Sequence, residues 1–310
     1  MAGLGSITAR VCTAVVAVTA SIGTAGLAQA ADPGAPGKKV VVLGDSYAAH
    51  GDAVDAALTG QLSSCYHGAS AWPSQLRGLL GLAGTDQVSD HSCPGAMIES
   101  TEHYTLLQEA RDADAENAFG PQTQLVAIQL GMNDSWGVPG GLAAAFQGCE
   151  YDLIEGCDAE AVAAGRTPDM SGVTGAAYAE KISKVVAYIK YYAPNAHIVL
   201  MGYPEMAAPG TEALCVDPLG LPVAQRHAGP VLEYYERIDQ AKRDAAQQLG
   251  LEYFDTRAVT AGHGLCSPQP WVNGVLDPRA DFTGAPFHPS AAGDLAVATA
   301  LYNTFLYGHA

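Results

Sequence analysis

The feature that most constrains the fold is an alternation of short apolar runs with longer helical segments. The apolar runs are residues 40–43, 87–91, 124–130, 197–201 and 252–254. The helical segments are residues 52–58, 72–82, 106–118, 176–193, 230–249 and 289–306. Such alternation is typical of parallel βαβ units. We therefore predict an α/β fold whose helices flank a doubly wound parallel sheet.

The first 30 residues differ from the rest and are not counted in the fold. Arg10 is the only charged residue there, an Ala-, Val- and Thr-rich run follows, and Ala28-Gln29-Ala30 gives a small-x-small cleavage signal. We expect a secretory signal peptide that is cut after Ala30, and a secreted protein. An uncleaved anchor fits less well, because the segment is short and rich in Thr, Ser and Gly. Without a linker-like tract, residues 31–310 are predicted to form one domain.

Composition and charge limit the partners. The chain of 310 residues is 48% hydrophobic and 15% charged, which is enough to bury a full core. Its net charge of -17 argues against nucleic acid and anionic membrane surfaces as partners. After the first 30 residues, no stretch reaches the roughly 18 apolar residues that a membrane span needs. We expect a soluble monomer.

The cysteine count indicates disulfides. Of the seven cysteines, Cys12 lies in the predicted signal peptide and six follow it. An even number in an exported chain predicts three disulfides, for which the residues alone allow 15 pairings. The chain has no CxxC pair, so we expect no zinc site, no other metal and no cofactor.

Candidate functional residues lie where the predicted strands end. Ser46 follows the first strand, and Gly95 and Asn133 follow the next two. His288 lies in the long loop before the final helix. The carboxyl ends of parallel strands share one edge of the sheet, so we expect these four residues to converge there.

Ser46 is the candidate nucleophile. It lies at a turn from strand to helix, where backbone N–H groups favour negative charge. The alternative for a serine at this position is a plain helix N-cap. We choose His288 as the base because Phe287 and the two flanking prolines can hold its ring in place. His50, which follows Ser46 closely in the sequence, is the rival.

Acyl transfer also needs hydrogen-bond donors for the oxyanion. The candidates are the N–H groups of Ser46 and Gly95 and the side-chain amide of Asn133. Gly95 lets its N–H face a ligand with no side chain in the way. For Asn133 the alternative is an ordinary turn residue. We interpret Asp45 and Asp134 as acceptors that hold their loops, not as bases.

These motifs together resemble the SGNH (GDSL) hydrolases over nearly all of residues 38–308. They are, in order, Gly44-Asp45-Ser46, Gly95, Gly131-x-Asn133-Asp134 and His288-Pro289. Segments 261–266 and 270–274, with the six cysteines, are similar to the secreted actinobacterial lipase and esterase branch.

The resemblance implies a three-layer α/β/α, flavodoxin-like fold and a serine hydrolase of small-molecule or lipid esters, including acylated sugars. It implies Ser46 as nucleophile, His288 as base, and Gly95 and Asn133 as oxyanion donors. It also implies that the cysteines pair in sequence order, as Cys65–Cys93, Cys149–Cys157 and Cys215–Cys266.

One position departs from the family pattern. The family usually has an Asp three residues before the catalytic His, and this chain has Ala285 there. The acid of a triad mainly orients the base, so another group must fix the imidazole. Some members of the branch use a backbone carbonyl, which suggests that of Ala285 or Pro286. Asp281 is the alternative. A near-normal histidine as base predicts that activity rises through a pH of roughly 6–7.

Two other interpretations of the same residues are an α/β-hydrolase and a non-catalytic protein. An α/β-hydrolase needs a strand and an oxyanion loop before its nucleophile, and only residues 31–45 precede Ser46 after cleavage. A non-catalytic binding protein on the same scaffold is the second alternative. Five aromatic residues in loops are candidates to line an acyl pocket, with ordinary loop packing as the alternative: Trp136, Phe146, Trp271, Phe282 and Phe287.

Overall fold

The computed structural model covers the part of the chain that carries the predicted sheet and its helices. It describes residues 34–50, 65–101, 104–138, 141–143, 146, 150, 152–165, 167, 169–211 and 213–308. The predicted signal peptide and the predicted helix at 52–58 lie outside the described residues.

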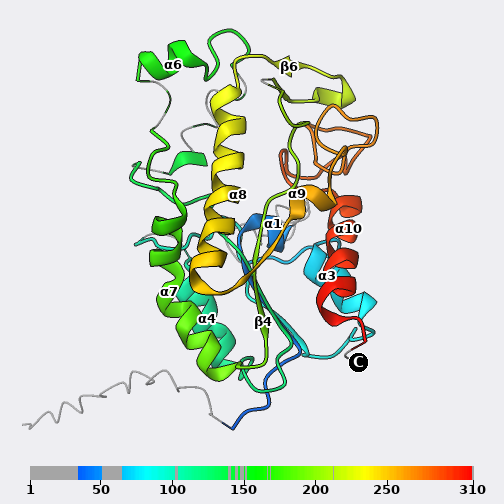
Figure 1. Cartoon of the computed structure of the whole chain (residues 1–310). Coiled ribbons are helices and arrows are strands. Elements are labelled where there is room, and N and C mark those ends of the chain that lie inside the picture. The colour runs from blue at the N-terminus through cyan, green and yellow to red at the C-terminus, as the bar shows by residue number, and fades with distance from the viewer. Residues whose placement is uncertain are drawn as a thin grey trace, which may run out of the picture.

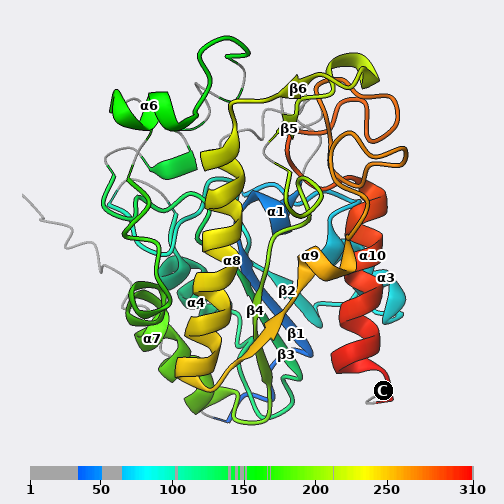
Figure 2. The ribbon, with the colours of Figure 1, turned by 45° about the horizontal axis from the view of Figure 1, so that its top comes forward.

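A five-stranded parallel sheet forms the centre of the molecule (Figures 1 and 2). Its strands are β1 (Val40–Gly44), β2 (Val88–Asp90), β3 (Leu125–Gln129), β4 (His197–Met201) and β7 (Glu252–Phe254). They lie in the order β2-β1-β3-β4-β7, and every neighbouring pair is parallel. This is the flavodoxin-like order, in which a crevice opens where the topology switches between β1 and β3. The predicted fold class and strand runs are confirmed.

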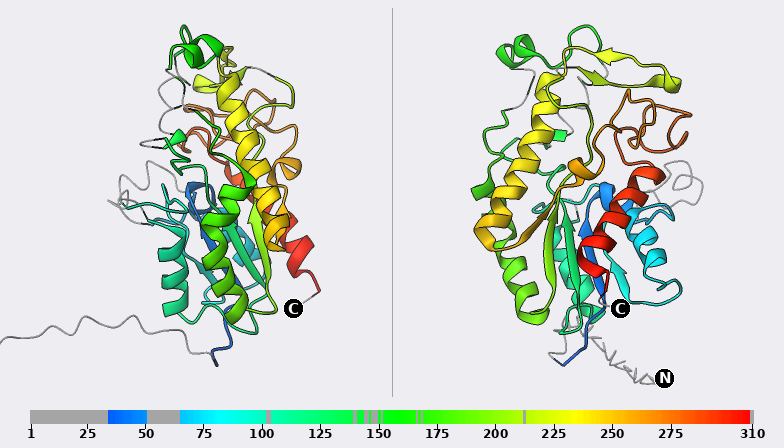
Figure 3. Two further views of the ribbon diagram at one scale, coloured as in Figure 1. Left: turned by 60° about the vertical axis from the view of Figure 1, so that its left-hand side comes forward. Right: turned by 45° about the vertical axis from the view of Figure 1, so that its right-hand side comes forward.

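Helices cover both faces of the sheet because alternate strand residues point to opposite sides. Val41 and Leu43 pack in the larger core, under α4 (Leu106–Ala115), α7 (Gly175–Tyr192) and α8 (Gly229–Leu249). Val40 and Val42 pack in the second core, under α3 (Trp72–Leu79), α10 (Ala291–Leu301) and the π-helical turn η2 (Tyr302–Leu306). Figures 1 and 3 show the sheet between these two helical layers. All five residues of β1 and of β3 are buried, as an apolar strand covered on both faces requires.

Long connections gather beyond the carboxyl ends of the strands (Figures 1 and 2). They contain the short helices α6 (Ala159–Ala163), α9 (Thr256–Val259) and η1 (Pro218–Gly220). They also contain an antiparallel pair that the sequence patterns did not predict, β5 (Leu214–Cys215) with β6 (Ala224–Gln225). In the described part of the chain, no helix is both long and apolar enough to cross a membrane.

Disulfides tie these connections together. The structure contains Cys65–Cys93 and Cys215–Cys266, two of the three pairs that the resemblance implies. Cys157 is also disulfide-bonded, and its expected partner Cys149 lies outside the described residues.

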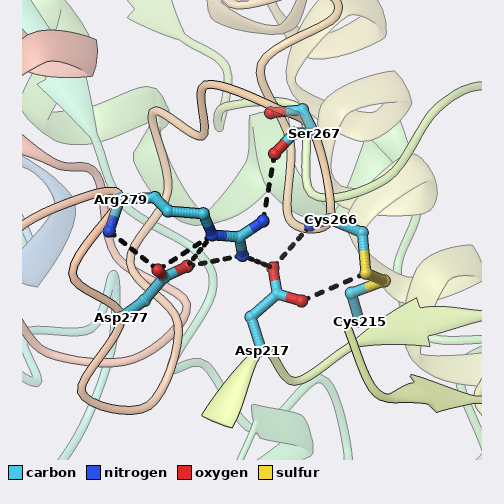
Figure 4. The surroundings of a disulfide bond; sticks show 6 residues. All are labelled: Cys215, Asp217, Cys266, Ser267, Asp277 and Arg279. Carbon is cyan, nitrogen blue, oxygen red and sulfur yellow. Dashed lines mark hydrogen bonds and ion pairs between the residues drawn. A yellow bond between two sulfur atoms is a disulfide. The ribbon is translucent and has the colours of Figure 1, made fainter. Parts of the chain in front are cut away.

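A buried ionic cluster surrounds the Cys215–Cys266 bridge (Figure 4). The guanidinium of Arg279 lies 2.9 Å from the Asp217 carboxylate and 2.7 Å from that of Asp277, and both aspartates are fully buried. The backbone N–H of Cys266 donates to Asp217 at 2.6 Å. The cluster joins residues 215–217 to residues 266–279, which precede residues 285–288 in the same long loop. Removal of Arg279 would leave two buried carboxylates uncompensated.

Candidate active site

The turn after β1 presents Ser46 at the first position of α1 (Ser46–Ala49). Asp45, not Ser46, is the N-cap, since its carboxylate accepts from the backbone N–H of Tyr47 at 2.9 Å. The N-cap alternative for Ser46 is therefore wrong, and its hydroxyl is available for other contacts. Gly44 is required here because a Cβ at this position would lie 2.7 Å from that of Ala48.

The structure brings Ser46 and His288 together from distant parts of the sequence. Ser46 Oγ lies 2.8 Å from His288 Nε2, and His288 Nδ1 lies 2.9 Å from the carbonyl oxygen of Pro286. A carbonyl can only accept, so Nδ1 carries the ring proton and Nε2 is free to accept from the serine hydroxyl. This is the tautomer that a general base needs.

Pro286 therefore supplies the orienting carbonyl, and the other two candidates make different contacts. The carbonyl of Ala285 accepts from the backbone N–H of His288 at 3.2 Å. Asp281 Oδ2 accepts from the backbone N–H of Ala291 at 2.7 Å, at the start of α10. Within the described residues, no hydrogen bond joins Asp281 to His288.

The rival base, His50, is buried and lies beside two carboxylates. Its ring nitrogens lie 3.8 Å from carboxylate oxygens of Asp281 and of Asp294. The nucleophile hydroxyl faces His288 instead. The geometry favours His288 as the base.

Asn273 clamps the loop that carries His288. Its backbone N–H donates to the His288 carbonyl and its carbonyl accepts from the Phe287 N–H, both at 2.8 Å. Its side-chain amide donates to the carbonyl of Pro289 at 2.9 Å. Phe287 has a φ of 64°, a left-handed conformation that costs about 1–3 kcal/mol for a non-glycine residue. The Asn273 bonds hold this conformation in place.

Tyr47 supports the imidazole from the nucleophile side. Its ring stacks on that of His288 with centroids 4.7 Å apart and an interplanar angle of 24°. Its hydroxyl donates to the Phe287 carbonyl at 2.9 Å and lies 3.1 Å from the hydroxyl of Tyr235. The residue after the nucleophile thus fixes both the ring and the loop of the base.

The turn after β3 places Asn133 beside Ser46 in one pocket. Asn133 Nδ2 donates one hydrogen to the Ala96 carbonyl at 3.1 Å, which sets the plane of the amide and leaves its second hydrogen for a ligand. Gly95, the residue before Ala96, has a φ of 77° and open space where a Cβ would be. Gly95 is exposed and is not among the residues that line the pocket of Ser46 and Asn133.

Asp45 and Asp134 make the loop-holding contacts expected of them. Asp134 accepts from the N–H groups of Ile98 at 2.9 Å and Glu99 at 3.3 Å, which ties the turn after β3 to the loop of Gly95. Burial raises the pKa values of both aspartates to about 6.

A buried polar network lies beneath the two turns, and sequence reasoning missed it. The Tyr203 hydroxyl donates to Asp45 at 2.6 Å and accepts from the Met132 N–H at 3.0 Å. The Lys242 ammonium lies 3.5 Å from the Tyr203 ring centroid and donates to the carbonyl of Met201 at 2.8 Å. Burial lowers the pKa of Lys242 to about 8. The ammonium compensates the acidic groups in this core.

A pocket of about 420 Å³ opens at Ser46 and His288. Asn133 lies in its wall, and α8 contributes Val231, Tyr234 and Tyr235. The pocket is further lined by Ala143, Phe146, Glu150 and Phe287. Its walls are mainly apolar, as expected of a site that binds a small organic ligand.

Only two of the five candidate aromatic residues line this pocket, Phe146 and Phe287. Trp136 instead stacks on Tyr178 at 5.8 Å and donates its indole N–H to the Gly131 carbonyl. Trp271 stacks on His263 with centroids 3.5 Å apart. Phe282 is 52% exposed. For Trp136 and Trp271 the packing alternative is supported, whereas the exposed Phe282 neither lines the pocket nor packs in a core.

Comparisons with known proteins show the family to which this chain is similar. A sequence model of the GDSL-like lipase/acylhydrolase family matches residues 42–296, a range that includes Ser46, Asn133 and His288. Lipase 1 of Streptomyces coelicolor is 29% identical over 283 residues, 90% of each chain. Lipase 2 of the same organism is 24% identical over 305 residues, 93% of this chain and 94% of that one.

Solved structures share the fold. The extracellular lipase of Streptomyces rimosus matches with a TM-score of 0.58 at 22% identity, over 86% of this chain and 99% of that chain. Phospholipase A1 of Streptomyces albidoflavus matches with a TM-score of 0.55 at 20% identity, over 86% and 98%. With the flavodoxin-like strand order, these likenesses rule out the α/β-hydrolase alternative.

The Asp281→Asn variant tests how the base is oriented. We expect ester turnover to change no more than about threefold, because the Pro286 carbonyl holds the ring and the new amide still offers an oxygen to Ala291. The measurement is kcat on a chromogenic acetate, with circular dichroism to verify folding. A loss of several orders of magnitude in a folded variant would restore a carboxylate triad.

The pH profile tests the state of the base. Burial lowers the pKa of the His288 imidazole below its usual 6.5, opposed by the bond to Pro286. The neutral ring is the form that accepts the serine proton, so kcat/KM on a neutral ester should rise with pH through a midpoint below 6.5. The sequence alone predicts a rise through roughly 6–7, and burial of the ring excludes the part of that range above 6.5. A midpoint above the usual histidine value, or no rise at all, would contradict the assignment.

Proposed function

The chain belongs to the GDSL-like lipase/acylhydrolase family, and we propose that it hydrolyses carboxylic esters through an acyl-enzyme on Ser46. It is an ester hydrolase of the lipase and esterase class. The observation that carries the mechanism is the 2.8 Å contact between Ser46 Oγ and His288 Nε2, with Nδ1 held by the Pro286 carbonyl.

In the first half-reaction, Ser46 Oγ attacks the ester carbonyl carbon while His288 Nε2 takes its proton. The tetrahedral intermediate collapses as the carbon–oxygen bond to the alcohol breaks, and the imidazolium returns the proton to the departing alcohol. In the second half-reaction, His288 Nε2 takes a proton from a water molecule as the water oxygen attacks the carbonyl carbon of the acyl-enzyme. The acid leaves and Ser46 regains its proton.

We assign the stabilisation of the oxyanion to three hydrogen-bond donors. The free hydrogen of the Asn133 amide and the N–H groups of Ser46 and Gly95 are the proposed donors. The amide plane is fixed by the bond to Ala96, so little reorganisation accompanies the reaction.

The imidazolium forms without a carboxylate beside it. The Pro286 carbonyl stabilises the Nδ1–H dipole, and the stacked ring of Tyr47 offers its π-face to the new positive charge. A cation over an aromatic face gains about 0.5–2 kcal/mol. The missing Asp was the argument for a non-catalytic binding protein, and these contacts support catalysis without that Asp.

We further propose that the enzyme is secreted and acts as a monomer. The predicted signal peptide and the disulfides support export. The net charge of -17 disfavours polyanionic substrates, and the apolar pocket favours small or lipid esters, acylated sugars included.

Two substitutions test the proposed chemistry. We expect Ser46→Ala to abolish ester hydrolysis and Asn133→Ala to lower kcat by about 10²–10³ with little change in KM, because the amide acts on the oxyanion and not on the bound ester. The measurement is steady-state kinetics on chromogenic esters of graded chain length.

Asn195→Ala is the matched control. This exposed asparagine donates to the Pro121 carbonyl, far in sequence from the strand-end turns, and its loss should leave kcat unchanged. Activity that survives in Ser46→Ala, or an equal loss in both asparagine variants, would refute the mechanism.

A further inference from the structure

Glu150 stands out in the pocket because the proposed mechanism gives it no role. It is the only carboxylate among the described residues that line the pocket, and no lysine or arginine lies among them. In the described part of the chain no hydrogen bond or ion pair joins Glu150 to Ser46 or His288, which already account for proton transfer.

The Glu150 carboxylate lacks any compensating partner among the described residues. By contrast, Asp45 and Asp134 accept hydrogen bonds from Tyr203 and from backbone N–H groups. Desolvation alone raises the pKa of Glu150 to about 7. A partly desolvated carboxylate without a partner is costly, so a cationic ligand that entered the pocket would be stabilised.

Aromatic side chains share the pocket with this carboxylate. Phe146, Tyr234 and Tyr235 line the same pocket, and the rings of the first two lie 5.5 Å apart. The hydroxyl of Tyr234 donates to the Met132 carbonyl and that of Tyr235 meets Tyr47, so both are engaged away from a ligand. A pocket that offers both a carboxylate and aromatic rings suits a quaternary ammonium group, which needs charge and π-faces but no hydrogen-bond acceptors.

We infer that Glu150 makes the pocket selective for esters that carry a quaternary ammonium group over neutral esters of the same shape. The inference rests on the proposed function, because it assigns specificity to the same site. Glu150 acts on binding and takes no part in the bond changes. It also disfavours esters whose acid or alcohol part is anionic, since like charges repel in a pocket of low polarity.

Two matched pairs of esters test the inference. Acetylcholine and 3,3-dimethylbutyl acetate differ only in one atom of the alcohol part, which is a positively charged nitrogen in the first and a neutral carbon in the second. Ethyl trimethylammonioacetate and ethyl 3,3-dimethylbutanoate differ in the same way in the acyl part. For each pair the readout is the ratio of kcat/KM, charged over neutral, in the wild type and in Glu150→Gln.

In at least one pair we expect this ratio to fall about tenfold or more in Glu150→Gln. A general loss of activity in the variant affects both esters of a pair and cancels within the ratio. The intrinsic reactivity of each ester is the same for both proteins and cancels when the two ratios are compared. Glu160→Gln removes the same charge from an exposed position in α6 and should keep the wild-type ratio. Equal ratios in the wild type and Glu150→Gln for both pairs would overturn the inference.

The pH dependence of the ratio adds a second readout. As Glu150 ionises, preference for the charged ester should rise with pH through about 7. The other titratable groups that line the pocket are His288, Tyr47, Tyr234 and Tyr235. Protonation of His288 changes kcat/KM for both esters of a pair alike, so it leaves their ratio unchanged. Burial raises the pKa values of Tyr47 and Tyr234 well above the usual range, so these two groups do not titrate near pH 7. A ratio independent of pH would contradict a role for the carboxylate.

Binding without turnover separates this inference from the proposed function. Calorimetry on Ser46→Ala should show tighter binding of acetylcholine, or of the trimethylammonioacetate ester, than of its neutral partner. This difference in affinity should vanish in the double variant that carries both Ser46→Ala and Glu150→Gln. Wild-type protein that hydrolyses no ester would refute the proposed function alone, whereas hydrolysis with no charge preference in either assay would refute only the role of Glu150.

Discussion

The hydroxyl of Tyr203 connects the two turns on which the site depends. It donates to Asp45, whose other oxygen caps α1 and presents Ser46, and it accepts from the N–H of Met132, next to Asn133. The Tyr203 hydroxyl thereby holds the turns after β1 and β3 in a fixed position relative to each other, at the switch point of the sheet. A buried network of this kind is stabilising only when every member is satisfied, so the geometry of nucleophile and oxyanion donor is set by the core beneath them.

The proposed base, His288, is positioned by backbone geometry in place of a buried acid. The left-handed conformation of Phe287 turns the chain so that the Pro286 carbonyl meets the imidazole two residues further on. Asn273 and Tyr47 hold this loop by hydrogen bonds to its backbone. A carbonyl fixes the tautomer as well as a carboxylate does, but it brings no negative charge. The site is correspondingly less able to stabilise imidazolium by Coulomb attraction alone, and the stacked Tyr47 ring contributes in its stead.

Sequence patterns predicted the sheet because its strands are short apolar runs, and they predicted the convergence of Ser46 and His288 because parallel strands end at one edge. They did not identify Tyr203 or Asn273, whose roles arise from contacts between distant loops. Lys242 lies on an amphipathic helix, where a lysine is ordinarily exposed, and nothing in its neighbours signals burial. The wrong aromatic assignments share that cause, since loop position does not reveal whether a ring faces a pocket or packs beneath it.

Covalent capture of the nucleophile tests the account most directly. An alkyl fluorophosphonate reacts when an activated serine oxygen attacks phosphorus and displaces fluoride. Intact-mass and peptide mass spectrometry should find a single adduct on Ser46 in the wild type, and labelling of His288→Ala should be slower by orders of magnitude. An adduct on another serine, or labelling at an equal rate without the imidazole, would contradict a nucleophile activated by His288.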